Sequence, residues 1–140
     1  MKKKVLIVAL CVLVLAGGIL AKLYLIGTKP LRGLTAGEVT AATVELYPPD
    51  ATLELTQEEI EELVSILNRA VTYRRDDTYE EYCGQAVIHT LTRTDGTQLR
   101  VQAYNPFVVI NGEGYRTKYG PCEELNQLGN DLLRKSNGEW

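Results

Sequence analysis

The sequence predicts an α+β fold, in which an N-terminal transmembrane helix is followed by a small β-β-α-β-β-β-β-α domain. Three observations predict it. A long apolar run stands near the N-terminus, two later segments repeat apolar residues with the helical period, and several short segments alternate apolar and polar residues around turn dipeptides. Antiparallel hairpins with amphipathic helices make a layered domain, so we expect an antiparallel sheet with two helices packed on it.

The first element is a membrane anchor at residues 1–27. Three lysines at positions 2–4 precede an apolar segment at residues 5–26, which Lys22 alone interrupts with a charge. A helix of this length spans about 33 Å, enough to cross a bilayer, and Lys22 near its end can reach the headgroups. Lysines before the span predict a single-pass protein of the cell membrane, with its N-terminus in the cytoplasm and its C-terminal domain extracytoplasmic.

Two other interpretations of the N-terminal segment remain open. The sequence Ala-Gly-Gly at residues 16–18 is an acceptable signal-peptide cleavage site, although apolar sequence continues beyond it. Lipidation at Cys11 requires a small residue before the cysteine, whereas Leu10 stands there. We therefore favour a signal-anchor helix that is not cleaved.

The rest of the chain is predicted as a linker at residues 28–37, rich in Gly, Pro and Thr, and one domain at residues 38–140. Beyond Lys22 the chain carries eleven Lys and Arg against eighteen Asp and Glu, a net charge of −7. This balance argues against nucleic acid as a partner, because phosphates require a basic surface. It also argues against peripheral binding to anionic lipid.

The domain is predicted to begin with a hairpin, because residues 38–47 and 51–55 alternate apolar and polar side chains around the sequence Pro-Pro-Asp. A helix should follow from Leu55 to Val71. Thr56 and Glu59 have the spacing of a capping box at its start. Its first turns are rich in glutamate, which the helix dipole favours, and we interpret these carboxylates as a solvated face rather than a metal site.

Two strands are predicted on either side of Asp95-Gly96, after a polar connection at residues 73–82. The pairing register of these two strands follows from the positions of their apolar residues, because a three-residue loop ending at Gly96 places those residues on one face. The pairs expected are Leu91 with Leu99, His89 with Val101, and Val87 with Ala103. His89 then lies on the apolar face, where we interpret it as a core histidine with a hydrogen-bond partner.

The last elements are a hairpin and a closing helix. Residues 104–107 predict a bend, and residues 107–119 a hairpin with Asn111-Gly112 as its turn. The helix should occupy residues 120–138, with Pro121 in its first turn and a leucine stripe facing the sheet.

Cys83 and Cys122 are the cysteines outside the anchor, and their even number in an extracytoplasmic domain makes them a disulfide candidate. A bridge closing this loop would stabilise the fold by roughly 3–4 kcal/mol. Two free thiols are the alternative. Cys83 and His89 lie six residues apart in and before a strand, which keeps them too far apart for a local dyad, so we assign no catalytic residue.

No metal site and no cofactor are predicted, because the cysteines and the single histidine lack paired spacings and no phosphate-binding loop occurs. The later strands are instead rich in aromatic residues, and tyrosine is favoured on recognition surfaces. The candidate binding surface comprises Tyr104, Phe107, Tyr115 and Tyr119. The alternative is that these rings are half-buried against the helices or the sheet edge.

Three stretches of the sequence carry a resemblance to known proteins, namely residues 44–77 (beginning VELYPPD), 84–97 (GQAVIHTLTRTDGT) and 103–133 (beginning AYNPFVV). Within residues 38–133, the chain resembles small single-pass membrane-anchored proteins of unknown function from Gram-positive, clostridia-like bacteria. The resemblance implies a location and an architecture, and it transfers no catalytic residue.

Together these observations predict a membrane-anchored, non-catalytic binding or accessory module. Its partner would be a protein, a peptide or an envelope component. Two alternatives stay open, a thiol-dependent enzyme using Cys83 or Cys122 and a small-molecule-binding sensor domain.

Overall fold

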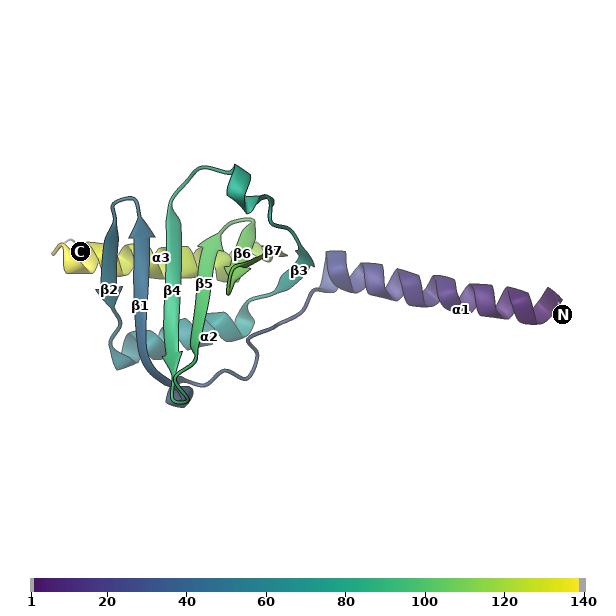
Figure 1. Cartoon of the computed structure of the whole chain (residues 1–140), viewed down its shortest axis with the longest axis horizontal. Coiled ribbons are helices and arrows are strands. Elements are labelled where there is room, and N and C mark those ends of the chain that lie inside the picture. The colour runs from purple at the N-terminus through teal and green to yellow at the C-terminus, as the bar shows by residue number, and fades with distance from the viewer. Residues whose placement is uncertain (1, 139–140) are drawn as a thin grey trace.

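The computed structural model describes residues 2–138 and shows a long N-terminal helix projecting from an α+β domain (Figure 1). The helix consists of α1 (Lys2–Ala21) and a short π-helical turn, η1 (Lys22–Ile26). Together they make 25 residues, long and apolar enough to cross a membrane. Met1 and the last two residues of the domain predicted at 38–140 lie outside the described part.

The domain contains a seven-stranded antiparallel sheet in the order β2-β1-β4-β5-β6-β7-β3, which confirms the predicted fold class. The strands are β1 (Val39–Tyr47), β2 (Ala51–Glu54), β3 (Thr72–Arg75), β4 (Ala86–Arg93), β5 (Gln98–Tyr104), β6 (Phe107–Ile110) and β7 (Glu113–Thr117). The sequence predicted only six of these strands.

The additional strand is β3, which lies in the segment predicted as a helix end and a polar connection. It pairs with β7 at the edge of the sheet, where Thr72 lies opposite Thr117 and Arg75 opposite Tyr115. Its four residues show no apolar alternation, so only the pairing with a strand about forty residues later reveals it. The preceding helix correspondingly ends at Arg69 rather than at Val71.

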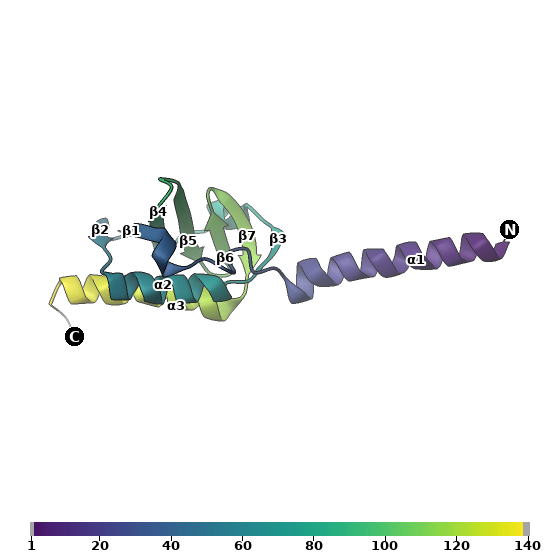
Figure 2. The ribbon, with the colours of Figure 1, turned by 90° about the horizontal axis from the view of Figure 1, so that it is seen from below.

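Helices α2 (Gln57–Arg69) and α3 (Tyr119–Ser136) lie side by side on one face of the sheet (Figure 2). The capping box at the start of α2 is confirmed. The backbone N–H of Glu59 donates to Thr56 Oγ1 at 3.3 Å, and that of Thr56 donates to Glu59 Oε1 at 2.8 Å. A bidentate ion pair between Arg69 and Glu124 joins the two helices, with N–O distances of 2.5 and 3.2 Å.

The predicted register of the β4–β5 hairpin is confirmed at all three pairs. Gly96 has a φ of 86°, the left-handed conformation that the three-residue loop requires. Because the register places alternate residues toward the helices, the core forms between the sheet and α2 and α3. Its fully buried side chains include Val44, Leu46, Leu63, Leu67, Val87, Leu91, Val101 and Leu125.

The segment predicted as a linker, residues 28–37, packs along the domain. Thr28 forms an antiparallel bridge with Thr72, and each backbone N–H donates to the other residue's carbonyl at 2.8 Å. Leu31 is buried, and the backbone N–H of Gly33 donates to Asn68 Oδ1 at 2.8 Å. A short 3₁₀ turn, η2 (Ala36–Glu38), then leads into β1. The chain therefore passes from the N-terminal helix into the domain without a free spacer.

The opposite face of the sheet is partly covered by the connection between β3 and β4, which contains the 3₁₀ turn η3 (Thr78–Glu81). The rings of Tyr79 and Tyr82 lie 6.4 and 5.4 Å from the ring of Phe107. The guanidinium of Arg116 stands 4.5 Å from the same ring. Phe107 is therefore enclosed between the sheet and this connection.

Candidate functional site

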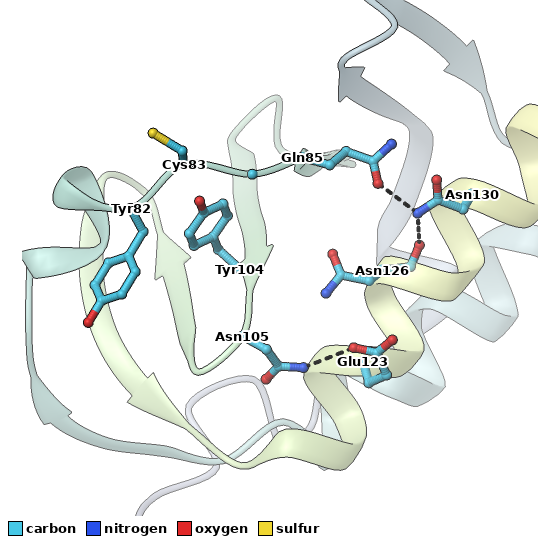
Figure 3. Close-up of a pocket in the computed structure, with 9 residues that line it drawn as sticks. Tyr82, Cys83, Gln85, Tyr104, Asn105, Glu123, Asn126 and Asn130 are labelled. Carbon is cyan, nitrogen blue, oxygen red and sulfur yellow. Dashed lines mark hydrogen bonds between the residues drawn. The ribbon is translucent and has the colours of Figure 1, made fainter.

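A polar concavity of the domain is a cleft of about 400 Å³ that lies between α3, the start of β4 and the end of β5 (Figure 3). We name it the α3 cleft. Its lining comes from three parts of the chain: the connection into β4, the turn after β5, and α3. The lining residues are Tyr82, Cys83, Gly84, Gln85, Tyr104, Asn105, Glu123, Asn126 and Asn130.

Helix α3 provides one wall of the cleft, because Glu123, Asn126 and Asn130 recur with the helical period on its polar side. The helix can lie close to the sheet because residue 129 is glycine. A Cβ atom there would stand 2.6 Å from Val87 Cγ1 and 3.3 Å from Val44 Cγ2. Close packing of α3 on β1 and β4 thus fixes the position of this wall.

Hydrogen bonds hold several of the lining amides in place. Asn130 Nδ2 donates to Gln85 Oε1 and to the carbonyl of Asn126, both at 2.9 Å. Asn105 Nδ2 donates to Glu123 Oε2 at 3.2 Å and to the carbonyl of Tyr119 at 3.3 Å. The walls are therefore joined to each other across the cleft before any ligand is present (Figure 3).

Two buried polar atoms of the cleft lack a protein partner among the described residues, the hydroxyl of Tyr104 and Oδ1 of Asn105. The Tyr104 hydroxyl lies beneath Gly84, where a Cβ atom would approach it to 3.0 Å. A buried polar atom without a hydrogen bond costs free energy, and such atoms are few in native proteins. These two unpaired atoms, together with the polar lining, make the α3 cleft the candidate site.

The charge of the lining restricts the ligand. Glu123 is the one formally charged side chain among the nine lining residues, and they include no Lys, Arg or His. The remaining polar groups are carboxamides, a thiol and phenols. An anionic ligand would therefore meet a carboxylate without a balancing cation, whereas hydroxyl, amide and ammonium groups would find partners.

The structure does not bring the four residues predicted as a binding surface together on one surface. Phe107 is fully buried beneath η3, so its inclusion was wrong, because a ring in a β-strand can be covered by a connection that the pattern does not reveal. Tyr115 donates from its hydroxyl to Glu113 at 3.0 Å and lies by Arg75. Tyr119 is 67% exposed at the start of α3, and only Tyr104 lines the cleft.

Cys83 and Cys122, the disulfide candidate, are both free thiols in the structure. Cys83 is exposed at the rim of the cleft, with its sulfur directed away from the cavity (Figure 3). Cys122 is buried in the first turn of α3, where its Sγ donates to the carbonyl of Phe107 at 3.4 Å. The even number of cysteines pointed to a bridge, but the fold places one thiol in solvent and the other in the core.

The surroundings of Cys122 oppose nucleophilic chemistry. Burial raises the pKa of its thiol to about 12, so the reactive thiolate is scarce at neutral pH. His89, the single histidine, is fully buried and is therefore a core histidine as predicted. Its Nε2 donates to the carbonyl of Leu125 at 3.0 Å, and burial lowers its pKa to about 4. We assign neither residue a catalytic role.

No metal centre is found within residues 2–138, because no three His, Cys, Asp or Glu side chains gather closely enough there to hold an ion. At the start of α2, Glu58, Glu61 and Glu62 are exposed, and Glu59 takes part in the capping box.

Most of the cleft was missed by the sequence analysis, including Gln85, Asn105, Asn126 and Asn130. The one signal available was the polar face of the closing helix, opposite its leucine stripe. A polar helix face is usually solvated, so this signal by itself does not distinguish a cleft from a surface.

Comparison of the chain with protein-family models, with curated proteins and with solved structures finds no match.

Proposed function

We propose that this chain is a single-pass, membrane-anchored binding module that holds an uncharged saccharide of the cell envelope in the α3 cleft. Its N-terminus would lie in the cytoplasm and its domain outside the membrane. One observation carries the proposal: the cleft contains two buried polar atoms, the Tyr104 hydroxyl and Asn105 Oδ1, without a protein partner among the described residues. The long apolar helix supports the location.

The chemistry of a saccharide fits this lining. Hydroxyl and acetamido groups can both donate and accept, as the carboxamides of Asn126 and Asn105 and the phenol of Tyr104 do. The exposed ring of Tyr82 at the rim offers an apolar surface for the C–H face of a sugar ring. The lone carboxylate of Glu123 can accept from sugar hydroxyls, and it disfavours phosphorylated or carboxylated ligands.

The proposed role is non-catalytic and requires no cofactor. The cleft holds one carboxylate, whereas glycoside hydrolysis ordinarily requires a pair of them. Cys83 at the rim directs its sulfur outward, and Cys122 lies in the core, so neither thiol faces the cavity as a nucleophile would.

The proposal can be tested by calorimetric titration of the detergent-solubilised full chain with chitotriose, which carries acetamido groups, and with cellotriose, which lacks them. We expect saturable binding of chitotriose. Tyr104→Phe should weaken it by about tenfold, because one buried hydrogen bond to the ligand is worth about 1 kcal/mol or more. Tyr115→Phe is the matched control, since that hydroxyl bonds to Glu113 elsewhere on the domain.

The outcomes separate the alternatives clearly. Binding of neither sugar contradicts the saccharide proposal. Binding that persists in Tyr104→Phe and weakens in Tyr115→Phe places the ligand outside the α3 cleft. Equal binding of both sugars would support the cleft as a saccharide site and would show that the acetamido group contributes nothing to affinity.

A sensor role is the second candidate, and one feature favours it. The connection from β3 to β4 leads from the strand that carries the Thr28–Thr72 bridge directly to Tyr82, Cys83 and Gly84 at the rim of the cleft. A ligand that orders the rim can thereby influence the strand beside the anchor. Chitotriose should then slow hydrogen exchange at the amide of Thr72, whereas an unchanged exchange rate would support binding without signalling.

A further inference from the structure

The end of the anchor is fixed against the edge of the sheet. Gly27 follows η1 with a φ of 72°, and a Cβ atom there would lie 2.5 Å from Val71 Cγ1 and 2.8 Å from the carbonyl oxygen of Thr72. The next residue, Thr28, bridges to Thr72 through two backbone hydrogen bonds of 2.8 Å. We call residues 22–34 together with β3 the tether edge. The contacts of Gly27 and Thr28 fix the position of β3 relative to the last turn of the helix.

This attachment determines how close β3 lies to the hydrocarbon of a membrane. Leu25 and Ile26, the last apolar residues of the helix, are 78% and 70% exposed, and burying them requires lipid. The guanidinium of Arg74, on β3, lies 4.9 Å from the ring of Tyr24 in the same turn. The headgroup layer on each side of a bilayer is roughly 5–7 Å thick. A bilayer that buries Leu25 and Ile26 would therefore place Arg74 near the depth of its lipid phosphates.

The charges at the tether edge are available for a ligand. Arg74 forms no ion pair within the described part of the chain, and the same holds for Lys22 and Lys29. The neighbouring arginines, in contrast, form ion pairs. Arg75 pairs with Asp77 and Glu113, and Arg116 with Asp76. Asp76, Asp77 and Glu113 are thus paired, whereas Arg74, Lys22 and Lys29 stay unpaired among the described residues.

We propose that Arg74, supported by Lys22, binds the phosphate of a phospholipid headgroup and so seats the tether edge on the membrane surface. The fork of the guanidinium can take two phosphate oxygens while its face stacks on Tyr24. This inference rests on the membrane anchoring contained in the proposed function. It departs from the expectation drawn from the net charge of −7, because lipid contact depends on the local charge within a Debye length of the surface.

The test uses the full chain, carrying carbon-labelled arginine guanidinium groups and reconstituted in bilayers of phosphatidylcholine and phosphatidylglycerol. Co-flotation with the vesicles after an alkaline wash first establishes anchoring. Rotational-echo solid-state NMR then measures dephasing of the guanidinium carbon by lipid phosphorus. We expect a dephased component in the native chain that is lost in Arg74→Gln. It should be retained in Arg100→Gln. Arg100 lies on β5, on the face of the sheet away from the helices, and also forms no ion pair among residues 2–138.

Each result has one meaning. Failure to co-float overturns the anchoring and this inference together. Co-flotation without dephasing, or with dephasing that survives Arg74→Gln, overturns the phosphate contact and leaves the anchoring intact. Loss of dephasing in Arg100→Gln as well as in Arg74→Gln would indicate a nonspecific charge effect and would also overturn the contact.

Discussion

The tether edge and the α3 cleft belong to the same sheet but differ in how their polar groups are paired. At the tether edge, Thr28 and Thr72 exchange two backbone hydrogen bonds, and beside it Thr117 Oγ1 donates to the carbonyl of Val71 at 2.7 Å. In the cleft, the Tyr104 hydroxyl and Asn105 Oδ1 have no protein partner among the described residues. The difference indicates that these paired groups near the anchor stabilise the fold, whereas the two cleft atoms make no hydrogen bond that would do so.

The largest expected effect concerns the two thiols at the cleft end of the molecule. Cys83 at the rim should react with iodoacetamide in the folded protein, whereas Cys122 should react about a thousandfold more slowly, because its pKa of about 12 leaves little thiolate. Peptide mass analysis over time, with and without denaturant, measures both rates. Modification of neither cysteine without reductant would reveal a disulfide and contradict the structure.

The next effect is a dependence of stability on pH that arises beneath the cleft. Burial lowers the pKa of His89 from 6.5 to about 4 in the folded state, so the unfolded chain binds a proton first as the pH falls. The free energy of unfolding should therefore drop by about 3 kcal/mol between about pH 6.5 and pH 4, and this contribution is fully present above pH 6.5.

The control for this titration is His89→Gln, which can still donate to the carbonyl of Leu125 but does not titrate. Thermal unfolding of the solubilised chain should show a much flatter profile for this variant in the same pH window. Asp76 does not confuse the comparison, because hydrogen bonds from Thr78 and then Arg116 lower its pKa to about 2. The stability that the Asp76 carboxylate contributes is therefore lost only at pH values below about 4. Equal slopes in both chains would refute the assignment to His89.

At the tether edge, Gly27→Ala should destabilise the local structure by about 2 kcal/mol, since its Cβ would overlap Val71 and its φ is positive. Hydrogen exchange at the amides of Thr28 and Thr72, which form the bridge, should accelerate correspondingly. Gly33→Ala is the control, because its φ is also positive but its Cβ would meet nothing within 4 Å. Similar acceleration in both variants would mean that the close packing at Gly27 contributes nothing.

The smallest effect compares one hydroxyl from each region. Thr117→Val removes a paired hydroxyl on β7, beside the tether edge, and should lower the free energy of unfolding by about 1 kcal/mol. Tyr104→Phe removes the unpaired hydroxyl of the cleft and should change it by less than about 0.5 kcal/mol. Denaturant titration of both variants tests the contrast directly. A larger loss in Tyr104→Phe would show that its hydroxyl supports the fold instead of serving a ligand.

Local signals in the sequence account for much of the architecture. The capping box at Thr56, the hairpin register around Gly96 and the length of the anchor each depend on residues close together in the chain. Periodicity and turn chemistry act over a few residues, so these features were predictable. The same holds for His89, because a register that gathers apolar residues on one face also places the histidine there.

The remaining features depend on contacts between distant segments, and the tertiary structure decided them. Strand β3 forms because it pairs with β7 and with Thr28. Phe107 is buried because the connection that contains η3 covers it. The segment predicted as a linker is fixed because Thr28 forms a backbone bridge with Thr72. The α3 cleft likewise requires Gly129 to bring a helix close to β1 and β4. The sequence by itself determined the elements and which of their faces are apolar, because those follow from local propensity and periodicity. Which polar groups found hydrogen-bond partners, and which were left without one, was decided by how the elements pack.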